Sequence, residues 1–283
     1  MTSDDLSTPT PDSLSISSEV LLHRMEEGEV FQVMDVRAPA RLAQGRLDRV
    51  PPELYQNVRG SELIQIHDLG DTGLEPELPA VVVCGHGKDS RVLAAHLARL
   101  GVTAFSLDGG LAGWMKFIAP RPLDPPEGLD HFIQFDRVGK GCLGYLLVSQ
   151  GEAVAVDPPL HFRKFEEALE TLEARLVAVA DTHVHADYVS GAVPMSRKFG
   201  IPYFLHPADA FYPYDGTPGR IDFEPLSDGG RISFGETTLQ VLHTPGHTEG
   251  SVTLLVEDRV ALTGDFVFVE SRGRPDLEGM EEE

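Results

Sequence analysis

Asp181-Thr-His-Val-His-Ala-Asp-Tyr188 places three metal-ligand side chains, His183, His185 and Asp187, close together in the sequence. On an extended segment, a His-x-His pair sends both imidazoles to the same face of the chain. Neutral imidazoles and ionised carboxylates are the ligands that suit Fe(II), Zn(II) or Mn(II). This stretch therefore predicts one half of a metal site.

Two later motifs supply the missing ligands. His247 lies in His243-Thr-Pro-Gly-His-Thr248, and Asp265 ends Thr263-Gly-Asp265. A short apolar run that is typical of a strand precedes each of the three motifs. These runs cover residues 176–180, 238–242 and 260–263. Because loops at one rim of a sheet hold ligands on a rigid scaffold, we expect folding to bring His183, His247 and Asp265 together.

The order His-x-His-x-Asp, Thr-Pro-Gly-His-Thr and Thr-Gly-Asp resembles the metallo-β-lactamase superfamily over residues 131–283. The resemblance implies an αββα sandwich. Within this superfamily, the sequences of residues 185–191 and of Gly273-Arg-Pro-Asp276 most resemble those of the persulfide dioxygenase branch, whose members oxidise a persulfide with O2. Carried over, this implies one Fe(II) per chain. Its expected ligands are His183, His247 and Asp265, and His185 and Asp187 would surround them or bind a second metal.

Position 188 separates two branches of that superfamily. Binuclear hydrolases such as glyoxalase II usually have a histidine there that binds the second metal, whereas this chain has Tyr188. A phenol has a reference pKa of about 10 and is a poor ligand for a divalent metal at neutral pH. One metal is therefore expected, with Tyr188 either at the substrate or simply packed in the core. Arg274 matches a residue that holds the carboxylates of a thiol substrate such as glutathione persulfide; the alternative is a solvated surface arginine.

A second candidate site lies in the first half of the chain. Residues 80–83 have the pattern of a short buried strand, and residues 91–100 have that of a helix, with Cys84 and a Gly-rich loop between them. The N-H groups of such a loop and the positive end of the helix favour a thiolate. A nucleophilic or sulfur-carrying Cys84 is one reading of this pattern. A small buried cysteine is the other.

The surroundings of Cys84 resemble the rhodanese family over residues 17–119. The resemblance rests on Asp35-Val-Arg37, on the Cys84-x-x-Gly87 loop and on residues 107–114. It implies an α/β domain in which Cys84 carries a persulfide, with Gly87 and Lys88 in the loop that binds its anionic group. Asp89 departs from the family, since many members have arginine there. Weak affinity for thiosulfate is therefore expected, because a carboxylate repels an anionic donor.

Composition and length support two α/β domains in the 283 residues. Residues 1–16 are expected to be a disordered tail, and residues 120–130, with their prolines, a stiff linker between domains at 17–119 and 131–283. After Asp265 the chain lacks the last elements that metallo-β-lactamase relatives usually have. We therefore expect an incomplete sandwich, together with a homo-oligomer or a partner chain that completes the fold.

Charge and cysteine content narrow the partners and the compartment. The formal net charge of -22 argues against binding to nucleic acid or to anionic membranes. Neither an export signal nor a run of apolar residues long enough to cross a membrane is apparent, so a cytoplasmic location is expected. Cys84 and Cys142 fall in different domains and form no disulfide framework. This fits a reducing compartment.

The sequence thus predicts an Fe(II)-dependent persulfide dioxygenase that acts on a low-molecular-weight thiol persulfide and is fused to a rhodanese-like sulfur carrier. Two alternatives remain open. One is a glyoxalase II-like thioester hydrolase that uses zinc. The other is an inactive or split protein that carries or binds sulfur without a working metal site.

Overall fold

The computed structural model describes residues 14–47, 49–185, 189–210, 221–268 and 271. The chain divides into two compact units. The first comprises residues 1–119 and 137–141, and the second residues 120–136 and 142–283. Each unit has its own sheets and its own core.

The first unit is built on a parallel five-stranded sheet with the order β1-β5-β4-β2-β3. Parallel neighbours require crossover connections, and helices and 3-10 turns provide them here. The strands are β1 (Ser15–Ile16), β2 (Gln32–Asp35), β3 (Tyr55–Asn57), β4 (Ala80–Val83) and β5 (Ala104–Leu107). The helices are α1 (Ser18–Glu26), α2 (Gly60–Leu63), α3 (Asp89–Arg99) and α4 (Gly110–Trp114), with 3-10 turns at Pro39–Gln44, Pro52–Leu54 and Leu69–Thr72.

Strand β4 explains why this sheet is stable. All four of its residues are buried, because both faces of the sheet are covered. Val81 and Val83 point to the same side as Trp114, whereas Val82 packs with Leu93 of α3 on the other side. A strand that is buried on both faces needs a continuous apolar run, which is what residues 80–83 supply.

The second unit contains two sheets. A seven-stranded sheet has the order β12-β11-β10-β9-β8-β7-β6, and an antiparallel four-stranded sheet has the order β13-β14-β15-β16. The strands of the first are β6 (Ala119–Leu123), β7 (His131–Arg137), β8 (Cys142–Ser149), β9 (Glu152–Val156), β10 (Arg175–Ala180), β11 (Tyr203–Leu205) and β12 (Glu224–Pro225). Those of the second are β13 (Arg231–Phe234), β14 (Thr237–His243), β15 (Val252–Val256) and β16 (Val260–Leu262).

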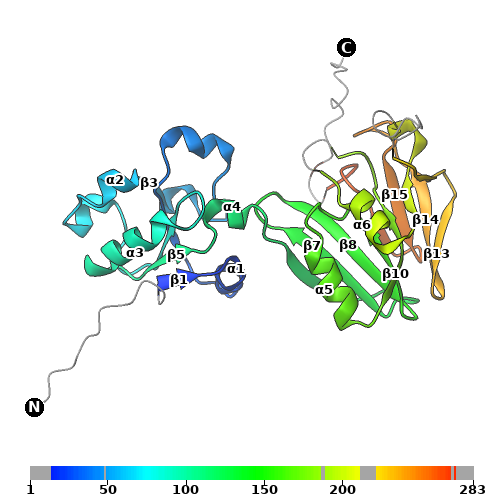
Figure 1. The fold of residues 1–283 in the computed structure, drawn as a ribbon, viewed down its shortest axis with the longest axis horizontal. Coiled ribbons are helices and arrows are strands. Elements are labelled where there is room, and N and C mark those ends of the chain that lie inside the picture. Colours follow the sequence, from blue (N-terminus) through cyan, green and yellow to red (C-terminus); the bar gives the residue numbers. More distant parts are fainter. Residues whose placement is uncertain (1–13, 48, 186–188, 211–220, 269–270, 272–283) are drawn as a thin grey trace, which may run out of the picture. The chain divides into compact units, whose positions relative to one another are not determined.

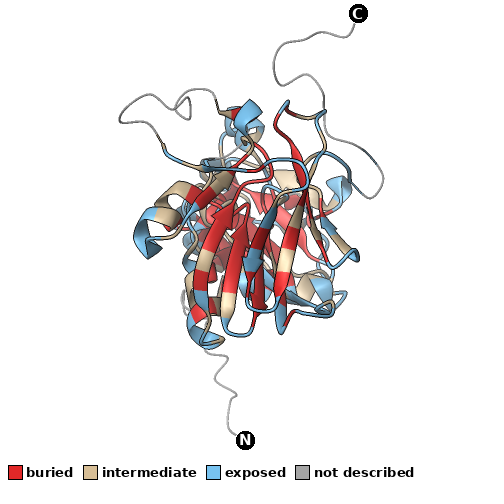
Figure 2. Cartoon of the chain, turned by 90° about the vertical axis from the view of Figure 1, so that its right-hand side faces the viewer, coloured by how far each residue is buried: buried red, intermediate tan, exposed pale blue. Residues whose placement is uncertain are grey.

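One apolar core joins the two sheets of this unit. It includes Val154 of β9, Ala178 of β10, Leu239 of β14 and Leu254 of β15. Helices α5 (Arg163–Thr171) and α6 (Ala192–Phe199) lie against the seven-stranded sheet, and Pro207–Asp209 forms a 3-10 turn (Figure 1). Figure 2 shows the buried residues concentrated along the strands. The packing of sheet on sheet confirms the predicted sandwich, and the parallel sheet confirms the predicted α/β domain.

Two details differ from the sequence prediction. Residues 15–16, assigned to a disordered tail, form β1. This strand pairs with β5, and its Ile16 is buried in the core of the first unit. Residues 120–123, assigned to the stiff linker, belong to β6 in spite of Pro120 and Pro122. Strand β6 is the edge of its sheet and pairs on one side only, so a missing N-H on the other side costs no hydrogen bond.

In the part of the chain that the structure describes, no helix combines the length and the apolar character that crossing a bilayer requires.

Candidate functional site

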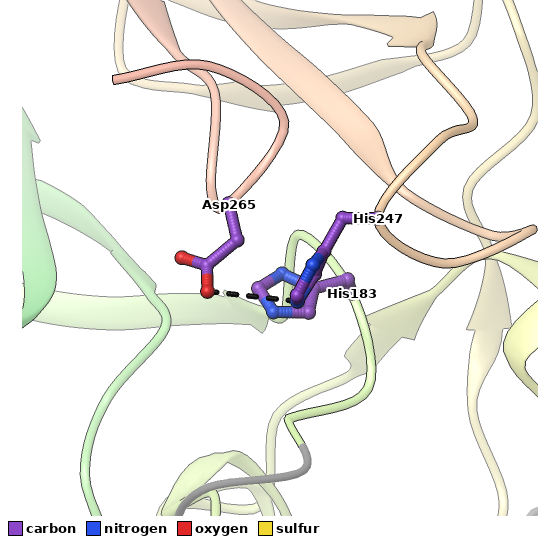
Figure 3. A group of neighbouring side chains, drawn as sticks. All are labelled: His183, His247 and Asp265. Atoms are coloured by element: carbon purple, nitrogen blue, oxygen red, sulfur yellow. Dashed lines mark ion pairs between the residues drawn. The ribbon is translucent and has the colours of Figure 1, made fainter. Parts of the chain in front are cut away.

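Three strand ends of the second unit converge on one group of ligand atoms. His183 follows β10, His247 lies between β14 and β15, and Asp265 follows β16. Figure 3 shows the three side chains side by side. One ligand atom from each lies within 4.8 Å of the others. His247 Nε2 is 3.5 Å from Asp265 Oδ2, and the rings of His183 and His247 lie almost at right angles with their centroids 4.9 Å apart. The structure therefore brings together the three ligands expected from the sequence.

The environment of His183 prepares it to bind a metal. Burial, together with the neighbouring His185 and His247, lowers the pKa of His183 to about 3. The imidazole is therefore neutral at physiological pH, and a nitrogen lone pair is available. Its Nδ1 lies 3.0 Å from the Thr182 hydroxyl, which in turn donates to Asp157 at 2.8 Å. Such a chain fixes the ring orientation of a metal-binding histidine and leaves Nε2 for the metal.

His185 is held by two buried carboxylates. Its Nε2 lies 3.2 Å from Asp157 Oδ1 and 3.7 Å from Asp181 Oδ1, while its ring centroid is 4.2 Å from that of His183. Burial alone would lower the pKa of His185, but the hydrogen bonds to both carboxylates outweigh it and raise the pKa to about 10. Ser190 and Tyr203 donate to Asp181 at 2.9 Å each. His185 thus lies beside the three-ligand group with Nε2 bound to carboxylates.

The donor set fits a divalent transition metal. Two imidazoles and one carboxylate form the combination that binds non-haem Fe(II) with open coordination positions, and the same side chains also suit Zn(II). Asp187 and Tyr188, expected near this site, and Arg274, expected to bind substrate, lie outside the described residues.

Gly264 allows Asp265 to approach the His-x-His loop. Its φ is +51°, and a Cβ there would lie 2.3 Å from Thr182 Oγ1. We expect Gly264→Ala to lower the free energy of unfolding by about 1–3 kcal/mol more than Gly229→Ala does, and to weaken zinc binding. Gly229 is the matched control, since it also has a positive φ, but a Cβ added there would meet no described atom within 4 Å. Urea denaturation of the metal-free variants measures the difference; equal losses would contradict the close contact.

The candidate sulfur-carrier site lies in the first unit, on the loop between β4 and α3. The Gly87 N-H donates to Cys84 Sγ at 3.0 Å, and Ser90 Oγ lies 3.3 Å from the sulfur. Ser90 is fully buried, and its hydroxyl also forms a hydrogen bond with the hydroxyl of Ser106 at 2.8 Å. Cys84 is 4% exposed and borders a cavity of about 770 Å³. The sulfur therefore has hydrogen-bond donors around it, and the residue that carries it borders a space that a small molecule can enter.

Charged side chains of both signs line this cavity. Lys88 and Asp89 are among them, and so are Arg37 and Arg41. Arg37 is neutralised by the buried Asp35, to which it donates at 2.6 Å. Arg91, which flanks the loop in the sequence, pairs instead with Asp108 at 3.7 Å. Asp89 thus borders the same space as Cys84, where its carboxylate would oppose an anionic sulfur donor.

The loop should make Cys84 more acidic than an ordinary thiol. Burial raises the pKa of the thiol, but hydrogen bonds from Ser90 and from the backbone N-H groups of the loop outweigh burial and lower the pKa overall. In a Cys142→Ser background we expect the alkylation rate of Cys84 to reach its half-maximum at a lower pH in the folded protein than in the urea-unfolded protein. Ser90→Ala should move this midpoint upward. A midpoint that is no lower in the folded protein than in the unfolded protein, and unchanged in Ser90→Ala, would contradict a thiol made more acidic by this loop.

Asp209 was not identified from the sequence. It is fully buried, and it accepts hydrogen bonds from Val184 N at 2.8 Å, Thr248 Oγ1 at 2.8 Å and Gly250 N at 2.7 Å. These donors belong to the loops that carry His183 and His247. A single aspartate after β11 has no motif around it, so no signal in the sequence could have revealed this contact.

Two models of known protein families match this chain, one in each unit. The family model described as "Metallo-beta-lactamase superfamily" matches residues 137–282, and the model described as "Rhodanese-like domain" matches residues 17–117. These matches identify the families of the two halves and not the reaction.

Three similar proteins illustrate the range of relatives. The probable polyketide biosynthesis zinc-dependent hydrolase PksB of Bacillus subtilis is 36% identical over 43% of this chain and 52% of its own length. The hydroxyacylglutathione hydrolase of Acidiphilium cryptum is 36% identical over 45% of this chain and 50% of its own length. The crystal structure of ETHE1 from Myxococcus xanthus has a TM-score of 0.42 and 26% identity, covering 56% of this chain and 62% of that one. The chain spans about half the length of the two curated relatives.

Proposed function

Because the chain belongs to the metallo-β-lactamase superfamily and carries a rhodanese-like domain ahead of the metallo-β-lactamase domain, we propose that it is an Fe(II)-dependent persulfide dioxygenase with a sulfur-carrier domain. Its substrate would be the persulfide of a low-molecular-weight thiol. Thiol chemistry in both domains favours a reducing compartment, which we propose to be the cytoplasm.

The observation that carries this proposal is the group formed by His183, His247 and Asp265. Two histidines and one carboxylate occupy one face of a metal and leave several positions for other ligands, which an oxygenase needs for substrate and O2. Tyr188 supports a single metal. The binuclear hydrolases of the metallo-β-lactamase superfamily, such as glyoxalase II, usually have a histidine at this position that binds the second metal.

The proposed reaction is R-S-SH + O2 + H2O → R-SH + H2SO3, in which the outer sulfur is oxidised, dioxygen is reduced and the S-S bond breaks. Fe(II) bound to the three side chains would supply the redox chemistry that dioxygen requires. Within the protein, neutral His183 keeps its orientation through Thr182 and Asp157. His185, beside His183, is held by Asp157 and Asp181, which fixes the second imidazole of the His-x-His segment next to the three-ligand group.

For the rhodanese-like domain we propose a separate sulfur transfer. The Cys84 thiolate attacks the outer sulfur of R-S-S⁻, a new S-S bond forms on Cys84, the original S-S bond breaks and R-S⁻ leaves. The N-H of Gly87 and the hydroxyl of Ser90 stabilise negative charge on the sulfur before and after transfer. Lys88, at the border of the cavity, would attract the anionic donor.

A thioester metallohydrolase is the second candidate, favoured by the 36% identity to the hydroxyacylglutathione hydrolase of Acidiphilium cryptum. The two functions differ in their need for oxygen. We propose to supply the iron-loaded and the zinc-loaded protein with glutathione persulfide and, separately, with a glutathione thioester. Sulfite formation that requires iron and air supports the dioxygenase, whereas oxygen-independent thioester cleavage by the zinc form would replace it with the hydrolase.

A further inference from the structure

We propose that Asp209 is a positioning residue that sets the separation of His183 and His247 for metal binding. The inference rests on the metal site of the proposed function and not on the reaction assigned to it. Asp209 touches neither ligand. It contacts the residues next to them in the sequence.

A single carboxylate oxygen joins the two ligand loops. Asp209 Oδ2 accepts from Val184 N at 2.8 Å and from Thr248 Oγ1 at 2.8 Å. Val184 directly follows His183, and Thr248 directly follows His247. The positions of the two histidine backbones are therefore tied to the same atom, although the two loops come from different sheets of the unit.

The second oxygen of Asp209 holds the far side of the His247 loop. Oδ1 accepts from Gly250 N at 2.7 Å, and a Cβ at Gly250 would lie 2.4 Å from Asp209 Cγ, so only glycine permits this approach. Ser251 Oγ lies 2.8 Å from Thr248 Oγ1 and accepts from Thr248 N at 3.0 Å. The hydroxyl of Thr248 is therefore fixed in the direction of Asp209.

The three donors require a carboxylate rather than an amide. Backbone N-H groups approach both oxygens of Asp209, one on each side. An asparagine of the same shape would turn its NH2 group toward one of these N-H groups, whichever way the amide is oriented. A buried N-H that loses its acceptor is unfavourable, and the loop that contains it would move.

The test is the affinity of Asp209→Asn for Zn(II), measured by competition with a chromophoric chelator. Residues that orient metal ligands typically change metal affinity by about 10- to 100-fold when they are replaced, and we expect a rise of this size in the dissociation constant. The absorption spectrum of the Co(II)-loaded variant should change too, because the angle between the two histidine ligands changes. Neither readout depends on enzymatic activity.

Asp228→Asn is the matched control. Asp228 also accepts a backbone N-H near this loop, from His243 at 2.9 Å, but it joins no ligand to another. It should leave Zn(II) affinity and the Co(II) spectrum unchanged. If Asp209→Asn does not fold, Thr248→Val, which removes one of the three donors, should weaken Zn(II) binding, and Thr248→Ser should restore it.

Wild-type Zn(II) affinity and an unchanged Co(II) spectrum in Asp209→Asn would overturn the proposal. A lower melting temperature of the metal-free protein would not rescue it, because a residue that only stabilises the fold would give the same decrease. The same holds for Thr248→Val if that variant is used. Failure of the proposed function is distinguishable: a protein without oxygen uptake can still show the loss of metal affinity.

Discussion

His183→Ala is expected to abolish stable metal binding. The variant keeps only two of the three converging ligands, His247 and Asp265. If the binding free energy is of the order of 12 kcal/mol, as for other protein zinc sites, one ligand of three accounts for about 4 kcal/mol, or roughly a thousandfold in the dissociation constant. Metal content after anaerobic iron loading and desalting should therefore fall from about one per chain to a small fraction.

His161→Ala provides the control for this variant. His161 lies in the same unit, is exposed and does not belong to the group of ligand atoms. It should retain the metal content of the wild type. Stoichiometric metal in His183→Ala would mean that the ion binds elsewhere, and the site described above would be wrong.

The second large effect is expected for Cys84→Ala. The variant should take up no sulfur from glutathione persulfide, because the sulfur that the Gly87 N-H and the Ser90 hydroxyl surround is gone. Mass spectrometry of the intact protein under non-reducing conditions would detect the gain of one sulfur atom in the wild type. Metal content should be unaffected, since the ligands belong to the other unit.

Cys142→Ser is the matched variant for that experiment. Cys142 is the second cysteine of the chain and is partly exposed at the start of β8. It should load sulfur like the wild type. If sulfur loading disappears in Cys142→Ser and persists in Cys84→Ala, the carrier is Cys142 and not Cys84.

The convergence of the metal ligands could be predicted because each ligand follows a recognisable strand. The apolar runs before His183, His247 and Asp265 correspond to β10, β14 and β16. Their strand ends meet because the two sheets share one core. Sequence periodicity identifies such strands, and the order of the motifs identifies the family. The convergence of these three side chains could therefore be predicted from the sequence alone.

The contacts that hold the ligands in place could not be predicted. Asp157 and Asp209 are isolated aspartates in the sequence, and only the fold brings them to Thr182 and Val184. Buried carboxylates of this kind have no characteristic spacing. Likewise, the prolines of residues 119–123 favoured a linker, because a sequence does not reveal which strand will become the edge of a sheet.

Oxygen uptake by the anaerobically iron-loaded protein on addition of glutathione persulfide is the most direct test of the proposed function, with metal content determined on the same samples. We expect uptake of oxygen in a molar amount equal to the sulfite formed, dependent on His183 and proportional to the iron bound. Iron-loaded protein that consumes no oxygen, with the metal still bound at His183, His247 and Asp265, would contradict the assignment as a persulfide dioxygenase.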